Sequence, residues 1–552
     1  MKYSTLFSIS LLFLLSLFIM FRQLIIPGYF SCIIQDTFDY TNWAWQFTEA
    51  LREGIIYPRW LSLNYWGYGS PFFIIYPPLA FYLVAFFNIF TDSVILAMNL
   101  SKFTALFFAG TGIFFFVKEF YSEKIALFTA IFYILFPYNI FGLYYSGTFG
   151  SIISLIWFAP ILLFLHRYIT YGQYNYIIYA GVCYGGLILT HLINAYIFSF
   201  VMISFIIFMC IIQNTPKKLF AIPLIIAVGL LISAFYVLPL IYEKQFLNTE
   251  TFIEEGFYFA NFFILPNLTD KLPVGSYWPV YYNIHLFYFC LFLVLITMFS
   301  IRILNLRAIK AMENLYIMNI FFVCIALFSM VLLFGISSFI WDHIPFFKYI
   351  EFPYRWLNIT TFSTVFLSAA GFFLPNNVYK TKRRHNMFIA SLFLILLLLN
   401  YKYISSANMF TEQELIPIKP VTSNTMHMPL GIDIDKLDKN ENKEKIALLN
   451  GKGNFDVILW RSAERIIEIS VQQSVTLRIR TFNFPGWKAY MDGVPTEIMT
   501  EEFTGAILIN VPKGKHRVVI KFEDTPVRYY SKVISLVSLL GIVFMLALCK
   551  KK

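Results

Sequence analysis

The sequence predicts a polytopic α-helical membrane protein with about twelve transmembrane helices and a small extracytoplasmic β-sandwich near its C-terminus. Two measures of composition place the chain in a membrane: 59% of its residues are hydrophobic, and its mean hydropathy is +0.68. Both exceed what soluble domains carry. A third observation, the alternation of polar and apolar residues in short runs after Phe455, predicts the β-sandwich.

Apolar windows long enough to cross a bilayer account for the predicted transmembrane helices. The first window is too long for a signal-peptide core and no cleavage site follows it, so we expect it to stay attached as a helix. The windows are 5–26, 95–117, 125–144, 149–168, 175–191, 193–213, 218–241, 285–303, 314–340, 354–375, 387–404 and 530–549.

Basic residues between these windows explain the net charge of +11 through the positive-inside rule, so no nucleic-acid partner is expected. The segments predicted to be cytoplasmic contain Lys2, Lys118, Lys124, Arg167, Lys217, Lys218, 302–310, 380–384 and 550–552. Both termini are then cytoplasmic. The apolar stretch 72–90 would reverse this topology if it crossed the membrane. We therefore expect it to be a juxtamembrane helix, because Pro77 and Pro78 suit a helix start and would disrupt a spanning helix.

Three regions are then expected outside the membrane: the loops 27–99 and 242–283, and the polar segment 405–528. The chain divides into a transmembrane domain with these loops (1–404), an extracytoplasmic β-rich domain (405–528), and a final helix with a basic cytoplasmic tail (529–552). The charged first part of the polar segment is typical of a linker. The β-strands are expected at 456–460, 465–471, 475–482, 506–511 and 517–522, with a turn at Asp492-Gly493.

Several functional classes lack support. The chain has no Walker loop, no dinucleotide-binding glycine fingerprint and no H-E-x-x-H motif. A nucleotide-driven pump and a membrane zinc protease are therefore not indicated. The six cysteines lie mostly in apolar spans and form no C-x-x-C pair, so they are interpreted as small core residues.

The first outer loop carries the candidate chemistry. Asp36 and Asp39 follow the first span, where a carboxylate can accept a proton from a sugar hydroxyl or hold a divalent cation such as Mg²⁺ or Mn²⁺. The alternative is that they only keep the loop solvated. Arg59 and Arg355 are the complementary cations, because a guanidinium can bind a lipid-linked phosphate with two hydrogen bonds. The alternative for Arg355 is an interfacial arginine paired with Glu351.

Three more residues complete the candidate site. His191 is expected at the outer surface between two spans, either as a ligand or proton-transfer group or as an interfacial hydrogen-bonded histidine. Tyr76 and Trp60 lie on the outer loop, where aromatic rings can stack on sugar faces. The alternative for such aromatic residues is the bundle core or the lipid interface.

Several motifs together resemble a known membrane family. They are Asp36-Thr37-Phe38, Gly54 to Trp60, Gly67 to Pro71, Tyr76 to Leu79, Leu189-Thr190-His191, Ala234 to Pro239 and Phe352 to Arg355. This combination resembles the bacterial family labelled 6-pyruvoyl-tetrahydropterin synthase-related, which is itself similar to the GT-C membrane glycosyltransferases. The segments 484–493 and 511–516 resemble the outer domain of YfhO-like membrane proteins.

The resemblance implies a GT-C-like enzyme that moves a sugar from a polyprenyl-phosphate donor to an envelope glycan or lipid acceptor, at the outer face of a bacterial inner membrane. It makes Asp36 the first candidate for base or metal holder and Asp39 the second. Ser146 and Ser151 stand where relatives tend to carry charged residues. That departure supports one alternative, a non-catalytic envelope assembly protein. The other alternative is a transporter of lipid-linked sugars.

Overall fold

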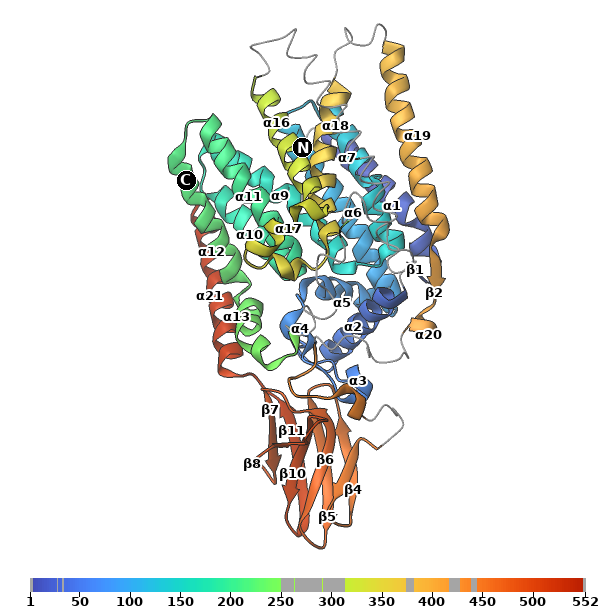
Figure 1. The fold of residues 1–552 in the computed structure, drawn as a ribbon, viewed down its shortest axis with the longest axis vertical. Coiled ribbons are helices and arrows are strands. Elements are labelled where there is room, and N and C mark those ends of the chain that lie inside the picture. Colours follow the sequence, from blue (N-terminus) through green and yellow to red (C-terminus); the bar gives the residue numbers. More distant parts are fainter. Residues whose placement is uncertain are drawn as a thin grey trace.

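The computed structural model contains a helical part and, at one end of it, two β-sheets (Figure 1). Both ends of the chain lie in the helical part, away from the sheets. The residues described are 3–26, 28–31, 34–249, 263, 290, 313–373, 382–415, 427–437 and 444–549. The predicted span 285–303 and most of the predicted loop 242–283 therefore lie outside the described residues.

Within the described residues, six helical stretches are long and apolar enough to cross a membrane. They are α1 (Tyr3–Ile25), α6 (Val94–Lys118), the stretch Glu123–Ser146, α9 (Phe149–Tyr171), α11 (Leu192–Ile212) and α21 (Pro526–Cys549). The stretch Glu123–Ser146 consists of α7 (Glu123–Ile134), α8 (Pro137–Phe141) and the π-helix η1 (Gly142–Ser146). Four further apolar helices have only 10–17 residues, so the count of about twelve spans stays a prediction.

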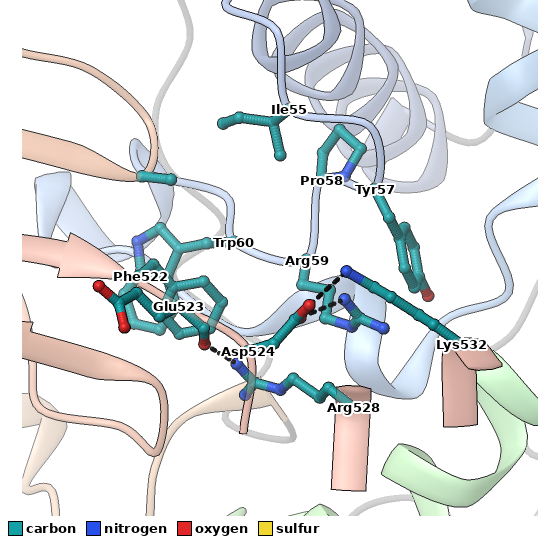
Figure 2. A pocket seen from close by; sticks show the side chains of 11 residues that line it. Ile55, Tyr57, Pro58, Arg59, Trp60, Phe522, Glu523, Asp524, Arg528 and Lys532 are labelled. Carbon is teal, nitrogen blue, oxygen red and sulfur yellow. Dashed lines mark hydrogen bonds and ion pairs between the residues drawn. The ribbon is translucent and has the colours of Figure 1, made fainter. Parts of the chain in front are cut away.

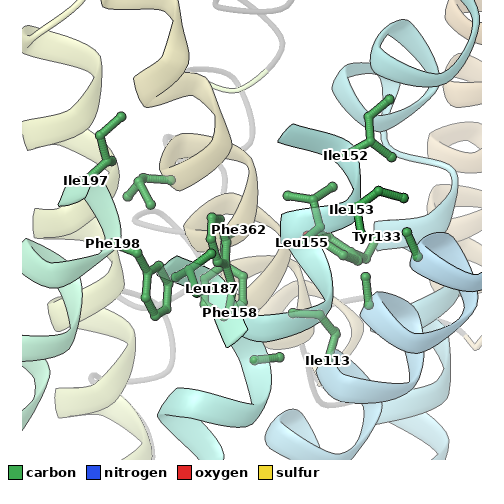
Figure 3. Close-up of a cluster of buried hydrophobic side chains, with 14 of the residues drawn as sticks. Ile113, Tyr133, Ile152, Ile153, Leu155, Phe158, Leu187, Ile197, Phe198 and Phe362 are labelled. Carbon is green, nitrogen blue, oxygen red and sulfur yellow. The ribbon is translucent and has the colours of Figure 1, made fainter. Parts of the chain in front are cut away.

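Aromatic and aliphatic side chains hold the helical part together. The remaining long helices are α10 (Asn175–Thr190), α16 (Glu313–Val331), α18 (Leu357–Phe373) and α19 (Lys382–Ser406). Figure 3 shows buried side chains from several helices meeting in one cluster, including Leu187 of α10 and Phe362 of α18. The rings of Phe158 and Phe198 stack there with centroids 4.4 Å apart. Close packing of this kind fixes the positions of α9 and α11, whose neighbouring ends carry part of the candidate site.

The predicted span 218–241 is bent in the structure, and its two parts together form one apolar stretch. The 3₁₀ helix η2 (Pro216–Phe220) and α12 (Ala221–Ile232) meet α13 (Ala234–Glu243) at an angle of 82°. A break frees backbone groups that need partners in an apolar environment. Ser535 of α21 is the partner of two such groups. Its hydroxyl accepts from the Phe235 N–H at 2.9 Å and donates to the Leu231 carbonyl at 3.2 Å.

Replacing Ser535 by alanine should therefore destabilise the protein by about 1–3 kcal/mol, because two backbone groups at the bend lose their partner. The measurement is the midpoint of thermal unfolding of the purified protein in detergent. Ser538→Ala is the matched control, because the exposed Ser538 hydroxyl donates only to Ile534 of its own helix. Equal midpoints for the two variants would contradict this account of the bend.

Short helices fill the space between the spans and the sheets (Figure 1). They are α2 (Ile34–Arg52), α3 (Asn64–Gly67), α4 (Phe72–Ile75), α5 (Leu79–Thr91), α17 (Ser338–His343) and α20 (Glu412–Leu415). The predicted helix start at the two prolines is confirmed, because Pro78 is the N-cap residue of α5. With 13 residues, α5 is about 20 Å long, which is too short to span the hydrocarbon core. Its predicted place at the membrane surface stays a prediction.

The C-terminal region folds into two antiparallel sheets, as the alternating runs predict. One sheet has the strand order β3-β6-β10-β9 and the other β4-β5-β11-β7-β8. Their bounds are β3 Ile446–Leu449, β4 Gly453–Trp460, β5 Glu464–Val471, β6 Val475–Phe482, β7 Trp487–Met491, β8 Val494–Thr496, β9 Met499–Thr500, β10 Ala506–Val511 and β11 Gly514–Phe522. Asp492 and Gly493 form the predicted two-residue turn, both with positive φ.

One contact ties this β-domain to the helical part, and a separate strand pair joins two segments within the helical part. The loop after α2 adds Trp60 and Tyr68 to the β-domain core, and the Tyr68 ring stacks on Phe482 with centroids 5.1 Å apart. The strand β1 (Tyr29–Ser31) also pairs with β2 (Asn408–Phe410), which joins the segment after α1 to the segment after α19. The loop after α2 is therefore part of the interface between the helical part and the β-domain.

Candidate functional site

The helix α2 carries both candidate acids. Asp36 lies in the first turn of α2 and Asp39 one turn later, so the two positions share a face of the helix. The side chain of Asp36 is outside the part of the chain that the structure describes. Asp39 is partly buried, and its charge reaches the buried hydroxyl of Tyr65 and helps to raise that pKa, which burial raises most.

Tyr40, which follows Asp39 in α2, forms the centre of an aromatic cluster. The hydroxyls of Tyr40 and Tyr76 lie 2.9 Å apart, and the Tyr76 ring stacks on Phe72 with centroids 5.2 Å apart. Gly150, at the start of α9, permits this approach: a Cβ atom at this position would lie 2.7 Å from the Tyr76 hydroxyl. The same Cβ atom would lie 3.4 Å from the His191 ring. The predicted residues Tyr76 and His191 are therefore neighbours.

Arg355 faces this cluster from the 3₁₀ helix η7 (Pro353–Trp356) before α18. Its Nη1 atom lies 3.2 Å from the Glu351 carboxylate and donates to the Ile350 carbonyl at 2.6 Å. Burial, the largest single effect, acts to lower the pKa of Arg355, but the Glu351 charge together with the neighbouring tyrosine hydroxyls, including those of Tyr40 and Tyr76, outweighs it, so that this pKa is raised. The predicted alternative, an Arg355–Glu351 pair, is therefore present in the structure.

Glu351 has both a shifted pKa and an unusual backbone conformation. Burial raises the pKa of its carboxyl, although Arg355 acts in the opposite direction. Its backbone has φ 62° and ψ −56°, which is outside the favoured regions for a residue with a side chain. Strained, partly buried acids of this kind concentrate at functional sites. The sequence predicts Glu351 only as a partner of Arg355, because a single acid in an aromatic loop gives no other signal.

His191 caps a helix and stays neutral. It precedes α11, and its Nδ1 atom accepts a hydrogen bond from the Asn194 N–H at 3.1 Å. Burial, with a smaller effect from the Arg355 charge, lowers the pKa of His191 to about 3. The predicted alternative of a hydrogen-bonded histidine therefore describes its local role, and the Arg355 effect places it in the same electrostatic environment as the Tyr40–Tyr76 pair.

His427 also joins this region, and sequence reasoning missed it. It lies within the predicted linker, yet only 6% of it is exposed, and its ring centroid lies 4.6 Å from that of Phe72 and 6.4 Å from that of Trp43. Asn248 donates to the neighbouring Met428 carbonyl at 3.0 Å. Residues 427–437 are thus packed against the rest of the protein, which corrects the linker interpretation for this segment.

Replacing His427 by phenylalanine, which suits its aromatic surroundings, should make the stability less dependent on pH. Burial lowers the pKa of His427 from 6.5 to about 3. The unfolded chain therefore binds the extra proton first, so the stability is fully present above pH 6.5 and is lost as the pH falls below it. Thermal unfolding in detergent between pH 7.5 and 4.5 measures this slope. His343→Phe, at an exposed histidine, is the control, and equal slopes for the two variants would contradict the prediction.

Ser146 and Ser151 lie beside the same region. With Thr148, Tyr354 and Asn358 they are among the residues that line a small cavity of about 50 Å³. The Ser151 hydroxyl accepts from the Asn194 amide at 3.1 Å, and the Ser146 hydroxyl lies 2.9 Å from that of Thr148. The two serines therefore line a cavity next to Tyr354, the residue that precedes Arg355.

Arg59 and Trp60 lie against the β-domain and not beside the Tyr40–Tyr76 pair. Arg59 donates to the Asp524 carboxylate and to the Phe235 carbonyl, both at 3.2 Å, and Trp60 packs on Trp487 with centroids 5.2 Å apart. Among the described residues, Arg59 contacts Asp524, Phe235 and Tyr57. Arg355 instead contacts Ile350, Glu351 and Phe352. The structure thus brings together Tyr76, His191 and Arg355, and it places Arg59 and Trp60 against the β-domain.

No group of three or more histidine, cysteine or acidic side chains capable of holding a metal ion occurs within the described residues. This search does not include the side chain of Asp36, so a divalent cation at Asp36 and Asp39 stays a prediction. Two carboxylates one helical turn apart could supply part of an oxygen ligand set for Mg²⁺ or Mn²⁺.

The family model of the 6-pyruvoyl-tetrahydropterin synthase related domain, described as a membrane protein, matches residues 73–409. The chain belongs to this membrane-protein family, as the motifs predict. A search of curated proteins found no match.

Three solved structures of an oligosaccharyltransferase from Archaeoglobus fulgidus are similar in fold, each with a TM-score of 0.43. The apo form is 12% identical and covers 75% of this chain and 57% of that chain. The complex with an inhibitory peptide and a dolichol-phosphate is 15% identical with the same coverage. The complex with zinc and sulfate is 14% identical and covers 74% and 54%. This chain therefore spans little more than half the length of those proteins.

Proposed function

We propose that this chain, as a member of that membrane-protein family, is a glycosyltransferase that moves a sugar from a polyprenyl-phosphate donor to an envelope glycan or lipid acceptor. The observation that carries the proposal is that α2 turns Tyr40 toward Tyr76, with Arg355 and His191 close by. Asp36 precedes Tyr40 by one helical turn, so both positions are on one face of α2. We therefore propose that the Asp36 carboxylate and the Arg355 guanidinium act in one reaction centre.

The roles follow from where charge develops. As the sugar leaves its donor, negative charge grows on the polyprenyl phosphate, and a fixed guanidinium aimed at it stabilises the transition state more than the ground state. Arg355 is the group proposed for this task. Asp36, with Asp39 second, would take the proton of the acceptor hydroxyl or orient that hydroxyl through Mg²⁺ or Mn²⁺. The neutral His191 and the Tyr40–Tyr76 pair would position the substrates.

The rest of the protein supplies the setting. We propose that the centre lies at the outer face of a bacterial plasma membrane, with both termini in the cytoplasm and the β-domain on the outer side. The β-domain would help to bind the acceptor glycan or close over the centre. Trp60 has no proposed contact with the sugar, because only 2% of it is exposed.

One observation bears on the transporter alternative. Lys102 is fully buried within α6, where it donates to the Gln23 side chain at 3.3 Å and lies 3.4 Å from the centre of the Tyr29 ring. Ionisable groups inside spans often mark transport pathways. Its described partners are a neutral amide and an aromatic ring, and this one lysine does not form a chain of ionisable groups. The enzyme is therefore preferred.

The test is sugar transfer by the purified protein in detergent, with a panel of radiolabelled polyprenyl-phosphate sugars and envelope glycan acceptors. Asp36→Asn should lower transfer by about 100-fold or more. Asp92→Asn is the control, because Asp92 is an exposed acid at the end of α5. Donor binding without transfer across the panel would favour the assembly protein or the transporter, and full activity of Asp36→Asn would remove Asp36 from the site.

A further inference from the structure

A second pocket lies at the junction of the helical part and the β-domain, apart from the proposed reaction centre. Its volume is about 170 Å³, and its polar lining includes Arg59 of the outer loop, Asp524 after β11, and Arg528 and Lys532 of α21 (Figure 2). We infer that this pocket binds the phosphate of an anionic phospholipid, so that Arg59 and Lys532 hold a headgroup from the surrounding bilayer.

The pocket has an excess of positive charge. Arg59 and Lys532 share one carboxylate: the Asp524 oxygens lie 3.2 Å from Arg59 and 2.5 Å from Lys532. Arg528 is balanced by Glu243 at 2.9 Å, and Glu523 is balanced by Lys488 at 2.9 Å. One positive charge is therefore left over at the Arg59–Lys532 end, which a phosphodiester would neutralise.

Arg59 is held ready for such a ligand. Only 4% of it is exposed, its guanidinium lies 4.2 Å from the centre of the Tyr57 ring, and the Phe235 carbonyl fixes one nitrogen. Its Nε atom is buried without a hydrogen-bond partner among the described residues. A buried donor without a partner is costly, and a phosphate oxygen in the pocket would satisfy it.

The position of the pocket favours a lipid as the source of the phosphate. It opens beside the first turns of α21, a helix of which only 11% is buried in its apolar window. Tyr529 and Tyr530 are exposed on those turns, and tyrosines are enriched at the level of lipid headgroups. Lys532 is partly exposed next to them, where a lysine can reach a headgroup while its stem contacts apolar surface.

The inference does not rest on the proposed function, because it is tested by binding. The full-length protein in zwitterionic nanodiscs is titrated with phosphatidylglycerol, and retained lipid is counted by native mass spectrometry. Lys532→Gln should weaken retention about five-fold, and Arg59→Gln should weaken it at least as much. Lys513→Gln is the control, because Lys513 is an exposed lysine of the β-domain outside the pocket lining.

Parallel titrations with phosphatidylcholine, polyprenyl phosphate and inorganic phosphate identify the source of the bound phosphate. Preference for phosphatidylglycerol over phosphatidylcholine that disappears in Lys532→Gln supports the inference. Equal retention of the two lipids, or an unchanged preference in Lys532→Gln, overturns it. Displacement by polyprenyl phosphate at equimolar amounts also overturns it, since the pocket would then hold the donor lipid. Binding of inorganic phosphate with no phosphatidylglycerol preference overturns it as well. Thermal unfolding of each variant confirms that it is folded.

Discussion

Arg355→Gln is expected to lower the rate of sugar transfer about 100- to 1,000-fold, because it removes the positive charge proposed to stabilise the departing phosphate. The loss should fall on kcat more than on KM, since the phosphate gains charge only as the bond to the sugar breaks. Arg355→Lys should recover part of the rate, because it keeps the charge but loses the two-pronged geometry. Steady-state transfer kinetics with the best donor of the panel measure both effects.

Stability must be separated from catalysis in this experiment. Removing Arg355 takes the partner from Glu351, whose pKa burial already raises. Without the guanidinium the carboxyl should protonate, and this limits the cost to folding. Glu351→Gln is the matched control, because it breaks the same 3.2 Å pair and keeps the arginine. Normal transfer by a folded Arg355→Gln variant would exclude Arg355 from the reaction centre.

The fold was predictable where local pattern decides it. The strands β4 to β6 follow from alternation, the hairpin turn from Asp492-Gly493, and the start of α5 from its prolines. The bend at Ser233 was not predictable in this way. The segment 218–241 is apolar on both sides of the bend. The hydroxyl that stabilises the bend comes from Ser535, 300 residues away from Phe235.

The site was predictable in part for the same reason. Asp36 and Asp39 lie on one helix as their spacing allows, and Tyr76, His191 and Arg355 come from motifs that end at neighbouring points of the bundle. The place of Arg59 depends on Asp524, 465 residues later, and that of His427 depends on a segment whose composition resembles a linker. Partners so distant in sequence leave no local signal.

Glu243→Gln is expected to destabilise the protein by about 3–5 kcal/mol, because it leaves the buried Arg528 without a counter-charge. Both side chains are 1% exposed and 2.9 Å apart. Arg528 also donates to the carbonyls of Pro485 and Glu523. Gly486 makes room for it, since a Cβ there would lie 2.4 Å from the guanidinium. This pair joins the end of α13 to the start of α21 and the β-domain, so its loss should loosen the junction of the two halves.

The unfolding midpoint in detergent measures this effect, and two comparisons isolate its cause. Glu464→Gln, which breaks an exposed pair with Lys521, should cost less than about 1 kcal/mol. The double variant Glu243→Gln with Arg528→Met should be more stable than Glu243→Gln alone, because no charge is then buried without a partner. If the double variant is the less stable of the two, the carbonyl hydrogen bonds of Arg528, rather than its charge balance, hold the junction together.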